Sequence, residues 1–233
     1  MITVDHLYDK KASCTLCNTS FITKKLRSSF IRVQSSDTDF YSRYSSEIYN
    51  PLYYYASVCP NCGFSFTDEF SLQAAPSSRK QLTELVWKRW TKKDYCGERT
   101  IHSALVSHKL ALYCAGLKQE THAVKAGVNH RLAWLYRFME NGEQEKRFLQ
   151  QALNEYLQSY MHEDYAGTKM TDMRILYLIG ELSRRLGQDG QAVRYFSRMI
   201  ESQSDSHEKG LIEMAKDRWQ EMRSVKGALQ SQA

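Results

Sequence analysis

Two pairs of cysteines constrain the fold of this chain more than any other feature. Cys14 and Cys17 enclose the first C-x-x-C turn, and Cys59 and Cys62 enclose the second. Such a turn holds two thiols at the short separation that a tetrahedral metal ion requires, and two turns together supply four thiolates. We therefore expect these four cysteines to hold one ion.

Zinc in a structural role is the expected occupant, because four thiolates leave no open position for water or substrate. Iron is the less favoured alternative, since the C-P-N-C-G sequence at 59–63 is also the one that rubredoxin uses, and four thiolates accept either ion. Against rubredoxin, Asn18 stands where that protein has glycine, and the 41 residues between Cys17 and Cys59 are too many for its compact fold. A redox-sensing thiolate site belongs to the same alternative.

The composition favours a globular protein in a reducing compartment. Hydrophobic residues make up 42% of the chain, and no apolar run approaches the roughly 18 residues that a membrane helix requires. The first residues show no signal-peptide or transit-peptide pattern. With four of six cysteines in the two pairs, metal binding is favoured over a disulfide framework. We expect a cytoplasmic protein without membrane contact, with Cys96 and Cys114 as buried packing residues in helices.

The net charge of +6 raises nucleic-acid binding as an alternative function. Residues 1–75 carry seven basic and seven acidic side chains, so the surplus lies in residues 76–233, with 25 basic and 19 acidic ones. Its densest group is expected on the outer face of one amphipathic helix over 79–93. The members are Arg79, Lys80, Lys88, Arg89, Lys92 and Lys93. They are candidate contacts for nucleic acid or a partner, although a solvated helix face is the simpler interpretation.

A change in composition around 71–78 predicts two units: a metal-binding module over residues 1–75 and a helical domain over residues 76–233. In the module we expect one or two short strands after the first cysteine pair, a polar loop over 34–46, and a strand over 49–58 that delivers Cys59 to the ion.

Two features of the module have alternative interpretations. Asp37 and Asp39 are expected in a solvated turn, with a second metal site or an acid–base pair as the less favoured alternative. The tyrosines of 49–55 are expected in the core, although tyrosines beside a zinc ribbon can also stack on bases.

The second unit is expected to be helical throughout, with helix pairs from Thr121 onward. Residues 176–199 are similar to a tetratricopeptide repeat, because Gly180 and Ala192 stand where two helices cross and Phe196 stands where a large side chain fills the gap. The preceding pair fits less well. Such pairs commonly curve around a groove that binds a peptide or a partner helix. The predicted fold class is mainly α: a small four-cysteine, zinc-ribbon-like β module followed by a tetratricopeptide-like α-helical bundle or solenoid.

Several motifs resemble those of one bacterial family, the domain-of-unknown-function family numbered 2225. Besides the cysteine pairs they are D-T-D-F at 37–40, N-P-L-Y-Y-Y at 50–55, V-C-P-N-C-G-F at 58–64 and H-K-L-A-L-Y-C at 108–114. The resemblance covers nearly the whole chain. It implies a cytoplasmic bacterial protein with a metal-binding N-terminal part and tetratricopeptide-like helices, with the four cysteines as ligands, and it implies no activity.

The expected function is that of a non-enzymatic adaptor, in which the zinc module is joined to a helical scaffold that binds a protein or peptide. No G-x-S-x-G, glycine-rich phosphate loop or H-E-x-x-H sequence is present to indicate an enzyme. Nucleic-acid binding through 79–93 and rubredoxin-like redox chemistry are the alternatives.

Overall fold

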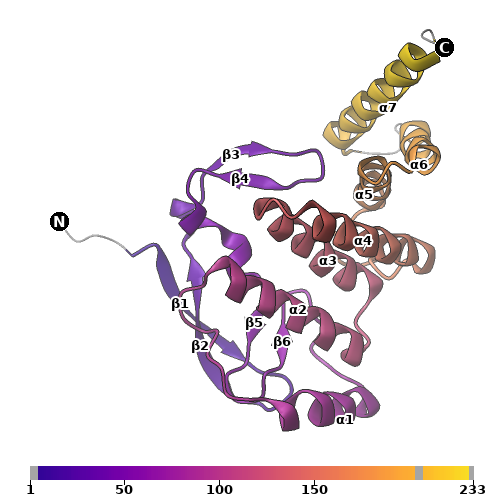
Figure 1. Ribbon diagram of the computed structural model, residues 1–233. Helices are drawn as coiled ribbons and strands as arrows, with labels where there is room; N and C mark the ends of the chain where they lie inside the picture. Colours follow the sequence, from indigo (N-terminus) through magenta and orange to yellow (C-terminus); the bar gives the residue numbers. More distant parts are fainter. Residues whose placement is uncertain (1–4, 203–206, 231–233) are drawn as a thin grey trace.

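The computed structural model describes residues 5–202 and 207–230 (Figure 1). Within these ranges, three two-stranded antiparallel hairpins occupy the N-terminal third and seven α-helices follow. The chain is thus mainly helical with a small β part at its N-terminal end, as the sequence predicts. Across the same ranges, every helix is too short or too polar to traverse a bilayer.

Two of the hairpins turn through the cysteine pairs. β1 (Leu7–Ser13) pairs with β2 (Ser20–Leu26), and the turn between them holds the first pair. β5 (Ser57–Val58) pairs with β6 (Ser65–Phe66), and their turn holds the second. The predicted strand over 49–58 is therefore wrong except for its last two residues. Pro51 begins a 3₁₀ helix there, because its ring fixes a helical φ and the Asn50 side chain accepts from the Leu52 amide.

A third hairpin lies where a polar loop was predicted. β3 (Val33–Ser36) pairs with β4 (Ser42–Tyr44), and short 3₁₀ helices at Ser28–Phe30 and Glu47–Tyr49 lie on either side of it along the chain. Its strands are mostly polar and carry no alternating hydrophobic pattern, which is why the sequence shows no strand signal here. The turn at 37–41 places its side chains against the helices, as described below.

The helices follow in pairs of neighbours, with α3 and α4 side by side at the centre of Figure 1. Thr121 and Thr171 cap two of them, each accepting a hydrogen bond from an amide three residues on. Gly180 faces the Phe196 ring so closely that a Cβ would come 2.7 Å from it, which is the small-against-large contact that the sequence predicts. Whether the pairs form true tetratricopeptide repeats stays a prediction. The bounds are α1 Pro76–Leu85, α2 Ile101–Lys118, α3 His122–Phe138, α4 Gly142–His162, α5 Asp172–Arg185, α6 Asp189–Glu201 and α7 Lys209–Gln230.

One hydrophobic core runs across the predicted boundary between the two units. Leu7, Tyr53 and Tyr54 from the N-terminal part belong to the same buried cluster as side chains of α2 to α5. The core interpretation of these two tyrosines is thus confirmed. The connecting segment is also fixed, because the buried Lys118–Glu120 ion pair at the end of α2 bonds to Ser71. The division into 1–75 and 76–233 stays a prediction, and its first four and last three residues lie outside the described ones.

Candidate metal centre

The four predicted ligand cysteines converge. Their sulfur atoms all lie within 4.8 Å of one another, with Cys14 Sγ 3.5 Å from Cys62 Sγ and Cys17 Sγ 3.6 Å from Cys59 Sγ. Sulfurs placed about 2.3 Å from a central ion at the corners of a tetrahedron are about 3.8 Å apart, whereas a disulfide brings them to about 2.05 Å. The arrangement therefore fits one ion among four thiolates, and all four are free thiols.

The two cysteine turns have the same backbone. In each, the amide of the residue after the second cysteine donates to the carbonyl of the first, from Asn18 to Cys14 at 2.8 Å and from Gly63 to Cys59 at 2.9 Å. Asn18 and Gly63 both have a left-handed backbone conformation, with φ of +57° and +73°. Asparagine tolerates this conformation better than most residues. The presence of Asn18 in place of glycine therefore does not distinguish the first turn from a rubredoxin-type turn.

Backbone amides point at the sulfurs in a matching way. The Leu16 and Cys17 amides bond to Cys14 Sγ, and the Asn61 and Cys62 amides bond to Cys59 Sγ. Donors directed at a sulfur favour its thiolate form, which is the form that binds metal. A bond from the Cys62 thiol is the main cause that lowers the pKa of Cys14 to about 5, and the same bond raises the pKa of Cys62.

Two side chains from beyond residue 75 hold the two turns in place. Arg79 on α1 donates to the carbonyl oxygens of Thr15 and Leu16, at 3.1 and 2.6 Å. The Trp90 indole donates to the Pro60 carbonyl at 3.1 Å, and its ring lies so close to Gly63 that a Cβ there would come within 2.2 Å of it. Glycine at 63 is thus required both by its φ and by this contact. Each turn is fixed to the helical part by one long side chain.

An apolar shell closes the site. Cys14, Cys59 and Cys62 are buried, as are Phe64 and Leu82 beside them, and Cys17 is half-buried. Four sulfur donors of this kind suit zinc or iron, and a site with four protein ligands has no position for a substrate. Among the described residues it is the one group of three or more potential ligands that lie close enough to share an ion. The arrangement can therefore hold a metal ion and staple two hairpins together.

The six basic residues predicted on one helix do not share a helix. α1 ends at Leu85, a 3₁₀ turn covers Trp87–Arg89, and the chain is extended at Trp90. Beyond the helix, the chain brings the Trp90 indole to the second cysteine turn. Of the six, Arg79 and Lys80 lie on α1, Lys88 and Arg89 in the 3₁₀ turn, and Lys92 and Lys93 after it. Arg79 holds the first cysteine turn and Lys88 pairs with Glu84 at 2.7 Å. A binding role for the group stays a prediction.

The two remaining cysteines lie apart from the ligand set. Cys114 is buried on α2, as predicted, and its thiol accepts from the Ser65 amide at 3.5 Å. Cys96 is half-buried and lies in the irregular segment before α2, so its predicted place in a helix is wrong.

A second cluster was missed in the sequence, at the turn between β3 and β4. Asp39 has an exposed fraction of 0%, so the predicted solvated turn is wrong. Arg137 donates to its two carboxylate oxygens at 2.9 and 2.7 Å, and the Trp134 indole donates at 3.1 Å. Asp37 also accepts from Arg137, at 2.8 Å. Asp39 therefore forms a buried ion pair with α3.

The cluster extends to α5 through Arg185, which lies 3.3 Å from Asp39 and 2.7 Å from the buried Glu181. Burial alone raises the pKa of Asp39, but hydrogen bonds from His130 and Arg137 outweigh it and hold the pKa well below its ordinary range. The sequence does carry part of this signal, because His130, Trp134 and Arg137 are spaced so that they share one face of a helix. It does not show that this face contacts the D-x-D turn, since that contact is made only in the folded chain.

Comparison with known proteins identifies a family for this chain. A family model described as "Uncharacterized protein conserved in bacteria (DUF2225)" matches residues 7–222. No curated protein and no solved structure matches the chain.

Proposed function

Because this chain belongs to the DUF2225 family of uncharacterised bacterial proteins, whose description states no activity, we propose its function from the site. We propose that it is a non-enzymatic interaction protein. In this proposal a structural four-cysteine zinc site stabilises the N-terminal hairpins, and the helices form a scaffold that binds a protein partner. The observation that carries the proposal is the closed set of four sulfurs, held on both sides by residues of the helical part.

The metal proposed is zinc, and its role is mechanical. Four thiolates fill the coordination sphere, so the free energy of metal binding goes into folding rather than into polarising a substrate. Metal binding would also stabilise the positions of α1 and the segment that follows it, because Arg79 and Trp90 each bond to a carbonyl of one cysteine turn. The proposed setting is the cytoplasm, where the six free thiols would stay reduced.

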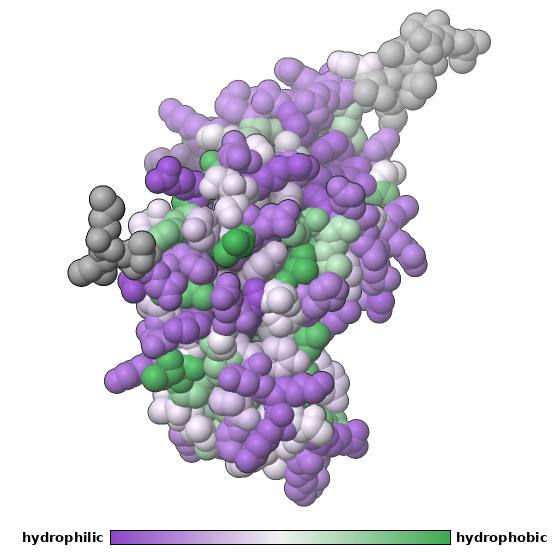
Figure 2. All heavy atoms as spheres, turned by 60° about the vertical axis from the view of Figure 1, so that its left-hand side comes forward, coloured by the Kyte–Doolittle hydropathy of each residue, from purple (hydrophilic) through white to green (hydrophobic). Residues whose placement is uncertain are grey.

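The helical part supplies the proposed binding surface. Helix pairs such as α3–α4 and α5–α6 are the units from which peptide-binding scaffolds are built. On the face shown in Figure 2, hydrophobic residues form small separate areas among hydrophilic ones. This favours a partner recognised through charged and polar groups over one that covers a large apolar patch.

The test compares a ligand variant with a matched control. Cys59→Ser removes a ligand, and Cys96→Ser removes a cysteine that lies outside the site. We expect the first variant to lose zinc and protease resistance across the N-terminal hairpins, and the second to keep both. In affinity capture with crosslinking from the native cytoplasm, wild type and the control should retain the same protein, and Cys59→Ser should lose it. Equal capture by all three, or capture of none by wild type, would contradict the proposal.

A further inference from the structure

The β3–β4 hairpin lies against the helices and not beside another sheet (Figure 1). All four residues of β3 are exposed, with Val33 at 52%. A two-stranded hairpin is at most marginally stable by itself, so contacts of its turn must hold it in place. The turn residue Phe40 has φ of +67°, a conformation that is unfavourable for a residue with a side chain and persists only where contacts impose it.

The turn is recognised by α3 through charge. Asp39 is fully buried and receives two hydrogen bonds from Arg137, at 2.7 and 2.9 Å, and one from the Trp134 indole at 3.1 Å. Asp37 binds the same guanidinium at 2.8 Å. Two carboxylates spaced two residues apart thus share one arginine, which is a specific and directional form of recognition.

The turn is recognised by α5 through its backbone and its aromatic ring. The Tyr177 hydroxyl donates to the Thr38 carbonyl at 2.8 Å. The Phe40 ring lies 5.5 Å from the Tyr177 ring and 4.6 Å from the Arg174 guanidinium. Recognition of a main-chain carbonyl together with one aromatic side chain is the way a scaffold reads a short peptide.

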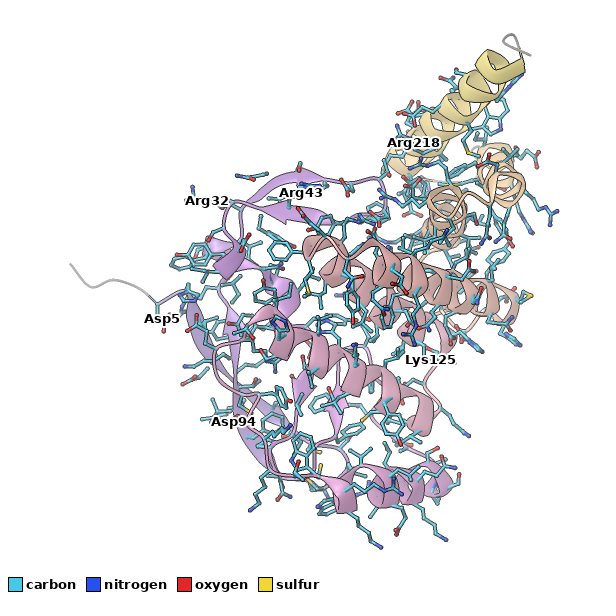
Figure 3. All side chains as sticks on the ribbon, in the orientation of Figure 1. Asp5, Arg32, Arg43, Asp94, Lys125 and Arg218 are labelled. Atoms are coloured by element: carbon cyan, nitrogen blue, oxygen red, sulfur yellow. The ribbon has the colours of Figure 1, made fainter. Side chains whose placement is uncertain are left out.

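Together these side chains form one surface, which we call the α3–α5 face. It consists of Trp134, Arg137, Arg174, Tyr177 and Arg185, together with the buried Glu181, which pairs with Arg185 at 2.7 Å and accepts from the Thr38 hydroxyl. Its three arginines outnumber this one carboxylate. α3 and α5 are the first helices of the α3–α4 and α5–α6 pairs, and the β3–β4 turn bridges them. In Figure 3, Arg43 lies along the hairpin and Arg218, which pairs with Glu221 at 2.7 Å, lies on α7 beyond the turn. The face is therefore complementary to an acidic segment that carries an aromatic ring.

We propose that the α3–α5 face is a binding site for an acidic–aromatic protein segment of the form Asp-x-Asp-aromatic. The β3–β4 turn is its occupant within the chain, and a segment of the partner protein takes the turn's place. This inference rests on the proposed interaction function and gives it a surface and a class of partner.

The intramolecular turn sets how tightly a partner can bind. A tethered occupant acts at a high effective concentration, and the apparent dissociation constant of a competitor rises as the fraction of unoccupied sites falls. Wild type should therefore bind a free Asp-x-Asp-aromatic peptide weakly. A chain whose turn lacks these side chains should bind the same peptide at least about tenfold more tightly.

The probe is a fluorescent peptide with the sequence of residues 34–44, titrated into the full-length zinc-loaded chain. The release variant replaces residues 37–40 by Gly-Ser-Gly-Ser and leaves every helix residue intact. In that background, Arg137→Gln removes the central contact of the face, and Arg147→Gln changes an exposed arginine on α4 as the matched control. A second peptide carries asparagine at both aspartate positions. If the release variant does not fold, Phe40→Ala replaces it, with a smaller expected gain in peptide affinity over wild type, because the turn loses its ring and keeps its aspartates on Arg137.

We expect the release variant to bind the first peptide more tightly than wild type does, with affinity that falls as salt rises. Arg137→Gln should abolish binding, Arg147→Gln should not change it, and the asparagine peptide should not bind. The assignment is overturned if a folded release variant does not bind the 34–44 peptide, or if it binds this peptide and the asparagine peptide equally. If a partner is still captured by wild type in that case, only this surface is wrong. If no partner is captured, the proposed function itself fails.

Discussion

Asp39→Asn tests whether the buried ion pair at the β3–β4 turn stabilises the fold. Asparagine has nearly the same shape and keeps an acceptor for the Trp134 indole, so the change removes mainly the charge. Loss of one member of a buried pair costs about 3–5 kcal/mol, because the remaining charge stays buried without compensation. In this variant Arg137 still has an ion pair with Glu145 at 2.6 Å, and Arg185 still has one with Glu181 at 2.7 Å. We therefore expect the low end, about 3 kcal/mol.

Asp37→Asn is the matched control on the same turn. Its side chain is 32% exposed and pairs with Arg137 at 2.8 Å, so the pair is partly screened by solvent. We expect a loss below about 1 kcal/mol. The assay is urea unfolding at pH 7, followed by tryptophan fluorescence and circular dichroism together, with an unchanged slope as the sign that the unfolded state is the same. Equal losses for the two variants would refute the view that burial makes Asp39 the stronger pair.

The pH dependence of this prediction has a defined sign. The pKa of Asp39 is lower in the folded than in the unfolded chain, where it is about 3.9. Its contribution to the free energy of unfolding is therefore fully present above that value and is lost as the pH falls toward the folded-state pKa. The difference between wild type and Asp39→Asn should be constant from about pH 7 to 5 and shrink below about pH 4.

Three further predictions concern the helices and the site. Gly180→Ala should cost about 1–3 kcal/mol in urea unfolding because its Cβ would meet a ring at 2.7 Å, whereas Gly190→Ala, with nothing within 4 Å, should cost nothing. Burial lowers the pKa of His108 to about 3, below the unfolded value of about 6.5. Between these two pH values the free energy of unfolding of wild type should fall by about 1.4 kcal/mol per pH unit relative to that of His108→Met. Arg79→Gln should increase zinc loss to a competing chelator about tenfold, and the neighbouring Lys80→Gln should leave it unchanged.

The cysteine spacing was sufficient to predict that the four sulfurs cluster, because a C-x-x-C turn specifies its own backbone. Helix caps are local in the same way, because Thr121 and Thr171 each bond to an amide three residues on. These features depend on a few neighbouring residues, which a sequence shows directly. The side chains that hold the cysteine turns act over longer separations. Arg79 lies 64 positions after Thr15, and Trp90 lies 30 positions after Pro60. Nothing in the neighbouring sequence distinguishes these two residues from others on the surface.

The errors have a common physical cause in tertiary contact. A basic helix over 79–93 was predicted from periodicity, but the helix ends at Leu85, and the chain beyond it carries Trp90 to the second cysteine turn. The turn at Asp39 was assigned to solvent because its composition is polar. A polar residue is buried when a distant partner satisfies it, and Arg137 lies 98 positions away in the sequence.

The most direct test of the central claim is X-ray absorption spectroscopy at the zinc edge on the purified full-length protein, with metal content measured on the same sample. The account predicts one zinc ion per chain surrounded by four sulfur atoms at about 2.3 Å, with no lighter atom in the first shell. A nitrogen or oxygen ligand would contradict the four-sulfur site, and an oxygen ligand from water would mean an open position that restores metal catalysis as an option. Iron in place of zinc, or a stably folded chain without metal, would contradict the structural zinc site itself.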